Sequence, residues 1–86
     1  MHKSRKIVLV RWIDSCGRGG WRTEETVKNY EPSSITSVGF QIKRTRQKIT
    51  LAISCEGSED GGDIGDVVTI PMGCVKEIET IRKQKA

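Results

Sequence analysis

The residue types best suited to bind a ligand gather in one glycine-rich segment near the start of the chain. Three glycines lie within four positions, and two arginines and two tryptophans flank or interrupt them. A glycine-rich backbone can turn successive N–H groups toward a phosphate, arginine can donate paired hydrogen bonds to its oxygens, and an indole can stack on a base. These types predict a site for a small anionic nucleotide, formed by Trp12, Asp14, Ser15, Arg18, Gly19, Gly20, Trp21 and Arg22.

The same segment also has a purely structural interpretation, which stays open at the level of sequence. Glycines permit a tight connection between two elements, and the two tryptophans would then serve to fill the core. The segment is not a nucleotide-hydrolysis loop, because it lacks the Gly-Lys-Ser/Thr ending of that motif. The choice is therefore between a phosphate cradle and a glycine-dependent connection.

A basic segment at 43–48 is the alternative candidate site. The formal net charge of the chain is +4, and positive charge is concentrated at both ends and in this segment. Such a surface attracts nucleic acid through its phosphates. Against this, no aromatic residue is interleaved with the charges, an acidic run follows at 56–66, and ordinary solubilising charge explains the segment equally well. The residues of this alternative site are Lys43, Arg44, Arg46 and Lys48.

The sequence gives little support for catalysis or metal binding. The single histidine is His2, so no base accompanies the acid, hydroxyl and thiol of Asp14, Ser15 and Cys16. Three cysteines do not form an even disulfide framework, and a zinc site would have to recruit His2. The acidic stretch does not have the spacing of a helix–loop–helix calcium site. We therefore expect a protein that is not an enzyme and has no cofactor and no metal.

Hydrophobic patterning predicts the elements that would position these residues. Apolar runs or alternation favour strands over 6–13, 35–42, 49–54, 67–70 and 76–82. On the second strand, Val38, Phe40 and Ile42 share one face. The basic segment contains no glycine, which favours a twisting hairpin over a tight turn. Residues 54–66 are rich in glycine and acid and predict a mobile loop.

Two further segments have helical features. Thr23 can cap a short helix over 23–30, in which Val27 and Tyr30 lie three apart and would turn one side toward the core. Its N-terminus would also point toward the glycine-rich segment and favour an anion there. The last apolar residues, at 75–81, also have helical spacing. A single turn at 72–74 followed by a short strand is favoured, with a helix as the alternative.

The chain is short enough to form one domain, 1–86. The expected fold is mainly β: a small five-stranded Src-homology-3/Sm-like barrel with one short helix inserted after strand 1. Closure would remove exposed sheet edges. Only four aromatic residues are available to a small core, which favours a homo-oligomer. The sequence has no apolar run of membrane-spanning length and no signal-peptide pattern, which predicts a cytoplasmic protein without a membrane partner.

Several short motifs resemble a group of small, uncharacterised bacteriophage accessory proteins, and the resemblance runs through nearly the whole chain. It implies a viral protein that acts in the cytoplasm of a host bacterium, and it transfers no catalytic residue. The main motifs are Trp12-Ile13-Asp14-Ser15, Gly19-Gly20-Trp21, Ser37-Val38-Gly39-Phe40 and Ile70-Pro71.

By analogy with phage proteins of similar size, the expected function is that of an anti-defence sponge. Such a protein binds and sequesters a small anionic nucleotide signal, here as a homo-oligomer and without catalysis. The analogy rests on size and setting, and fold alone does not establish function. Two alternatives stay open: a nucleic-acid-binding small-barrel module, and a protein–protein inhibitor of a host enzyme.

Overall fold

The computed structural model describes residues 5–57 and 62–84, which form a mainly β domain. All five predicted strands are present, and the last segment is a strand rather than a helix. The elements in chain order are β1 (Arg5–Asp14), α1 (Glu24–Val27), β2 (Ser33–Arg44), β3 (Lys48–Cys55), β4 (Ile64–Pro71), the 3-10 turn η1 (Met72–Cys74) and β5 (Val75–Gln84).

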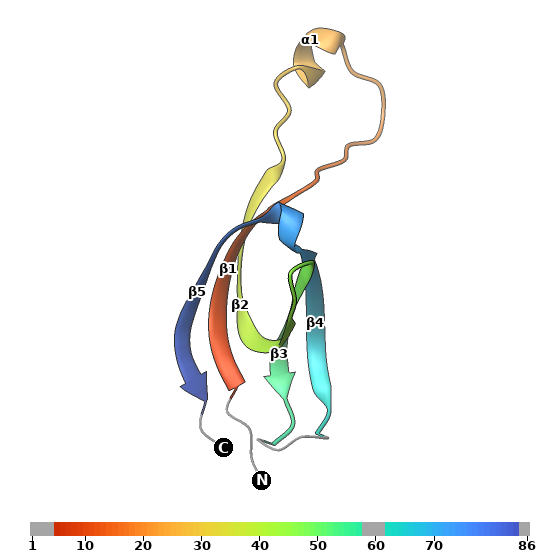
Figure 1. Cartoon of the computed structure of the whole chain (residues 1–86). Coiled ribbons are helices and arrows are strands. Elements are labelled where there is room, and N and C mark those ends of the chain that lie inside the picture. The colour runs from red at the N-terminus through yellow and green to blue at the C-terminus, as the bar shows by residue number, and fades with distance from the viewer. Residues whose placement is uncertain (1–4, 58–61, 85–86) are drawn as a thin grey trace.

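The strands form one antiparallel sheet in the order β4-β3-β2-β1-β5. Strands β1 to β4 follow one another as neighbours, and β5 returns to pair with the free side of β1. Figure 1 shows that β2 is strongly bent, so that β3 and β4 lie across from β1 and β5. No pairing joins β4 to β5 in the described residues, so the sheet is open there and the barrel is not confirmed.

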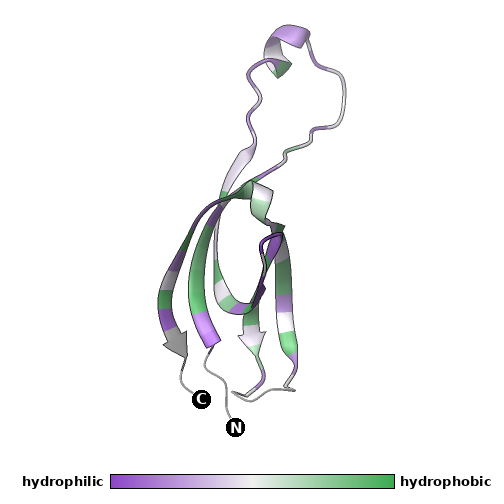
Figure 2. Ribbon diagram, in the orientation of Figure 1, coloured by the Kyte–Doolittle hydropathy of each residue, from purple (hydrophilic) through white to green (hydrophobic). Residues whose placement is uncertain are grey.

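The hydrophobic core lies on one face of the bent sheet. Its buried residues are Val8, Val10, Ile49, Leu51 and Ile70, and Trp12, Val68, Met72, Cys74, Val75 and Ile78 pack against them. The second strand contributes mainly small side chains, because Val8 pairs with Gly39 and Val10 pairs with Ser37. Figure 2 shows apolar residues spread along the strands, while the segment between β1 and β2 is mostly polar.

The apolar face expected on β2 lies away from this core. Val38 and Phe40 pair with Leu9 and Ile7, on the opposite face of β1 from Val8 and Val10. The side chain of Val38 is half exposed. Gly39, from the polar side of the pattern, is buried instead. Alternation therefore located the strand correctly, but the core takes the face with the smaller residues because the sheet bends toward it.

Residues 15–32 form an arm that leaves the sheet between β1 and β2. Figure 1 shows the arm projecting beyond the ends of these strands, with α1 near its tip. Every residue of the arm is exposed, and the molecule measures 59 × 22 × 19 Å along its principal axes. The arm is therefore held by its own contacts and by its two anchors in the sheet.

The helix in the arm is shorter than predicted and packs on nothing in the sheet. It spans four residues, none of which is buried. Val27 and Tyr30 are 41% and 39% exposed, so the prediction that they face the core is wrong. The physical reason is that the arm carries the helix away from the sheet before its apolar side chains can reach it.

The loop expected at 54–66 is shorter than predicted, since β3 continues to Cys55 and β4 begins at Ile64. Residues 58–61 of that loop lie outside the described residues. At its base, the N–H of Glu56 donates to the carbonyl oxygen of Asp63 at 2.8 Å. The Glu56 carboxylate accepts from the N–H of Asp63 at 3.3 Å. This pair of bonds closes the β3–β4 connection.

The bend of β2 brings its backbone unusually close to β3 at Gly39. A Cβ at this position would lie 2.7 Å from the carbonyl oxygen of Ala52 and 3.3 Å from its carbonyl carbon. Backbone atoms in a paired strand cannot move aside as a flexible side chain would. A glycine is therefore required here by space.

We predict that Gly39→Ala lowers the free energy of unfolding by about 1–3 kcal/mol, the usual cost of forcing extra volume into a packed site. The matched control is Gly17→Ala, because a Cβ at Gly17 meets nothing within 4 Å. That variant should change stability by less than about 0.5 kcal/mol. Urea denaturation followed by circular dichroism measures both, and equal stability of the two variants would contradict the close approach.

Candidate functional site

The arm holds the arginines and glycines of the first predicted site, and its own groups engage both arginines. The guanidinium carbon of Arg18 lies 4.9 Å from the centre of the Tyr30 ring, a cation–π arrangement. Arg22 donates from Nη1 to the carbonyl oxygen of Gly19 at 2.6 Å. Gly20 adopts a left-handed φ of 89°, which a side chain would strain. These contacts shape the arm.

The two tryptophans lie in different surroundings. Trp21 in the arm is fully exposed. Trp12 lies on β1, packs against the core, and donates from Nε1 to the hydroxyl of Ser37 at 3.1 Å. Asp14 ends β1 opposite Ser33. The structure therefore divides the predicted residues between the sheet and the arm and does not gather them around one cavity.

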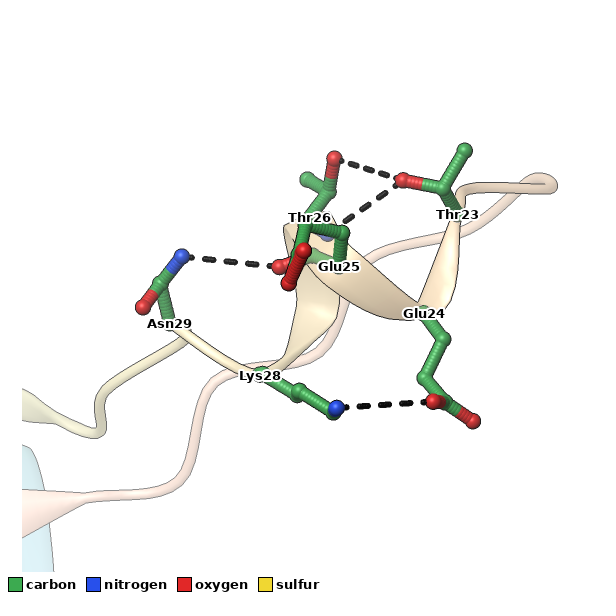
Figure 3. Close-up of polar contacts among 6 residues, drawn as sticks. All are labelled: Thr23, Glu24, Glu25, Thr26, Lys28 and Asn29. Carbon is green, nitrogen blue, oxygen red and sulfur yellow. Dashed lines mark hydrogen bonds and ion pairs between the residues drawn. The ribbon is translucent and has the colours of Figure 1, made fainter.

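Local hydrogen bonds shape the tip of the arm (Figure 3). The hydroxyl of Thr23 accepts from the N–H of Thr26 at 3.2 Å and lies 2.9 Å from the Thr26 hydroxyl. Lys28 forms an ion pair with Glu24, with 3.5 Å between Nζ and Oε2. The prediction that Thr23 caps this helix is confirmed. The cap satisfies one of the free N–H groups in the first turn of the helix with a side chain of the arm itself.

The basic segment forms the β2–β3 turn. The N–H of Thr45 donates to the carbonyl oxygen of Lys48 at 2.8 Å. The hydroxyl of Thr45 accepts from the N–H groups of Gln47 and Lys48 at 3.1 and 3.2 Å. The connection is thus tight without a glycine. The sequence signal for it was Thr45, whose side chain satisfies backbone donors that a glycine turn would leave to water.

An open hollow of about 820 Å³ lies against this turn, and we call it the basic hollow. Its size falls within the range of ligand pockets, roughly 300–1,000 Å³. The N–H of Met72 in η1 donates to the carbonyl oxygen of Gln47 at 2.8 Å, which ties one wall to the other. The residues that line the hollow are Gln41, Arg44, Thr45, Arg46 and Met72.

Gln41 gives the basic hollow a second kind of polar group. Its side-chain oxygen Oε1 is buried and accepts no hydrogen bond from the residues that the structure describes. A buried acceptor without a donor is costly. Arg44 and Arg46 offer donors to an anionic group, and Met72 offers apolar surface. The hollow therefore suits a ligand that has an anionic group, an N–H donor and a flat apolar part.

The other two residues of the basic segment lie outside the lining of the hollow. Lys43 pairs with Thr50, and Lys48 pairs with Pro71. Both lysine side chains are exposed. Sequence reasoning found the two arginines but missed Gln41 and Met72. The only signal for η1 was the turn expected around residue 72, and nothing in the sequence showed that this turn meets the β2–β3 turn.

Residues 5–57 and 62–84 contain neither a metal-binding cluster nor a membrane-spanning helix. Within these ranges, no three side chains of His, Cys, Asp or Glu lie close enough together to hold a metal ion. No helix in the same ranges is long and apolar enough to cross a membrane. The three cysteines are free thiols; Cys16 is exposed, and Cys55 and Cys74 are half-buried.

Comparison with known proteins adds no relative to this picture. No protein-family model, curated protein or solved structure matches the chain. The resemblance to small bacteriophage proteins therefore stays a prediction. The function has to be argued from the geometry of the chain's own residues.

We predict that Thr45→Val destabilises the protein, because it removes the acceptor for two backbone N–H groups of the turn. The expected loss in free energy of unfolding is about 1 kcal/mol. Thr50→Val is the matched control, since the hydroxyl of Thr50 contacts only the hydroxyl of Thr69 among the described residues. The urea midpoints of the two variants measure the difference in stability. A Thr50→Val variant that loses as much stability as Thr45→Val would contradict the role of Thr45 in the turn.

Proposed function

We propose that this protein binds and sequesters a small anionic nucleotide without catalysis, at the basic hollow. One observation carries the proposal: Arg44 and Arg46 line the same hollow as Gln41, whose buried side-chain oxygen Oε1 has no hydrogen-bond partner among the described residues. Two cationic donors beside an orphaned acceptor match the two polar ends of a nucleotide. Phosphate supplies the anion, and the exocyclic amine of a base supplies the N–H.

Four of the five lining residues then have distinct roles. Arg44 and Arg46 donate charge-assisted hydrogen bonds to phosphate oxygens, for which guanidinium geometry is well suited. Gln41 accepts from the amine of the base, and Met72 contacts its face. Sequestration needs affinity and abundance rather than turnover. The phage setting rests on the sequence resemblance alone, and the anti-defence role rests on analogy with phage proteins of similar size.

The contacts that the arginines already make favour the basic hollow over the arm as the binding site. In the arm, Arg18 stacks on Tyr30 and Arg22 bonds to the carbonyl oxygen of Gly19. A phosphate would compete with both contacts. Arg44 and Arg46 instead border open volume. Binding at the hollow therefore requires less rearrangement than binding at the glycine-rich segment.

We predict that Arg44→Ala/Arg46→Ala weakens binding of ADP-ribose or of cyclic dinucleotides by at least about 100-fold. A charge-assisted hydrogen bond contributes about 1.5–3 kcal/mol, and each 1.4 kcal/mol is tenfold in Kd. The measurement is isothermal titration calorimetry of the folded full chain against these nucleotides.

The matched control removes the same charge from the arm, as Arg18→Ala/Arg22→Ala. It should retain binding within about threefold, since it leaves the hollow intact. Loss of binding in the arm variant alone would place the ligand at the glycine-rich segment. No heat of binding across the nucleotides, with the wild-type protein folded, would overturn the proposed function.

A nucleic-acid-binding module is the second candidate, because the hollow is open and exposed Lys43 and Lys48 lie on the strands beside it. A single strand that passes over the turn would contact several of these charges. Its affinity would then fall with salt, with a slope of about −0.7 per phosphate contacted. Fluorescence anisotropy with a labelled oligothymidine between low and physiological salt tests this. Steep salt dependence, without binding of free nucleotides, would favour the polymer.

For the architecture, we propose an open variant of the Src-homology-3/Sm-type barrel. Support comes from the strand order, in which β5 returns to β1, and from the short turn η1 before β5. The bend of β2 supplies the curvature that such a barrel requires.

A further inference from the structure

Trp21 is the most exposed large apolar side chain among the described residues. It is 101% exposed, whereas the next large apolar side chain, Ile53, is 68% exposed. A tryptophan buries about 150–250 Å² when it is covered. Val27 and Tyr30 add further exposed apolar surface to the same arm. An arm with this composition gains by being covered.

A pocket at the base of the arm has the size and chemistry to receive an indole. Its volume is about 180 Å³, and its apolar walls are Trp12, Ile13 and Ile35. A cavity of about 150 Å³ accommodates a benzene ring. Arg11, Ser34, Thr36 and Lys76 form the polar part of its lining. We call it the arm-base pocket.

Charge favours the arm as the occupant of this pocket. Arg11 is paired with Glu77 at 2.7 Å, while Lys76 is the extra residue of a bulge in β5, opposite the step from Arg11 to Trp12. Bulges re-aim a side chain out of the regular pairing pattern. Glu25 follows Trp21 by four positions and is exposed, whereas Glu24 is already paired with Lys28. An indole in the pocket would carry the Glu25 carboxylate toward Lys76.

We propose that the arm-base pocket takes Trp21 of a second copy of this chain, so that two protomers exchange arms. Each copy carries one arm and one pocket, and a twofold arrangement fills both pockets with the same contact. The arm points away from its own sheet in Figure 1. Its tip is shaped by contacts within the arm, and it can therefore be presented to a partner as a formed unit.

The expected interface is large enough for a stable dimer. Two arms contribute Trp21, Val27 and Tyr30 twice, and the surfaces that receive them are covered as well. The two copies of Trp21 bury about 300–500 Å², the surfaces that receive them bury a similar area, and the exposed parts of Val27 and Tyr30 bring the total toward roughly 1,200 Å², the lower end for a specific interface. The basic hollow takes no part in this contact, so the inference does not depend on the proposed function.

Sedimentation velocity of the full chain over a range of concentrations tests the exchange. We expect the wild type to dimerise and Trp21→Ala to remain a monomer, with at least a 100-fold loss in dimer affinity. Ile53→Ala, which also trims an exposed apolar side chain, is the control and should still dimerise. A wild type that stays monomeric, or a Trp21→Ala variant that still dimerises, would overturn the proposal.

Exchanging the charges of Lys76 and Glu25 tests whether these two residues meet across the interface. Lys76→Glu and Glu25→Lys should each weaken the dimer by about tenfold, and the double variant should recover most of that loss. Additive losses in the double variant would overturn the pairing of arm and pocket. The Arg44→Ala/Arg46→Ala variant should dimerise as the wild type does. Loss of nucleotide binding is thereby distinguished from loss of the dimer.

Discussion

The close approach of β2 to β3 at Gly39 is the constraint on which the rest of the structure depends. Without a side chain at this position, the backbone of β2 can pass against the carbonyl group of Ala52. The resulting bend turns β3 and β4 toward β1 and β5. Val8 and Val10 on one side thus meet Leu51 and Ile70 on the other. A flat sheet of the same five strands would leave this apolar face in water.

The bend also builds the basic hollow. Gln41, Arg44 and Arg46 come from the end of β2 and its turn, and Met72 comes from η1, a part of the chain beyond two further strands. The bond from Met72 to Gln47 joins them only because β4 runs back along β3. Ligand binding at the hollow is thus coupled to the packing of the core. A substitution at Gly39 would therefore affect both ligand binding and the packing of the core.

The arm, in contrast to the sheet, is shaped by contacts within itself. Its capped turn and its ion pair are contacts between near neighbours in sequence, and Arg18 stacks on Tyr30 within the same arm. Such contacts can set a local shape, but each is weak when exposed, and none of them covers Trp21. The second copy proposed above would supply the missing burial. The sheet is stabilised by its own core, whereas the apolar residues of the arm have no core to pack against.

Local patterns in the sequence determined the elements. Alternation and β-branched runs predicted all five strands, and Thr23 predicted the helix cap. These features depend on neighbours a few positions apart, so they can be recognised along the chain. The two arginines of the basic segment could be found in the same way, as a local concentration of charge.

Tertiary structure alone decided which face of β2 is buried, where the arm lies, and which distant residues share a hollow. An alternating strand is compatible with burial of either face, and here the bend selected Ser37 and Gly39 over Val38 and Phe40. The spacing of Val27 and Tyr30 suited a core that the arm never reaches. Gln41 and Met72 meet through pairing of strands far apart in sequence, and no local pattern encodes that meeting.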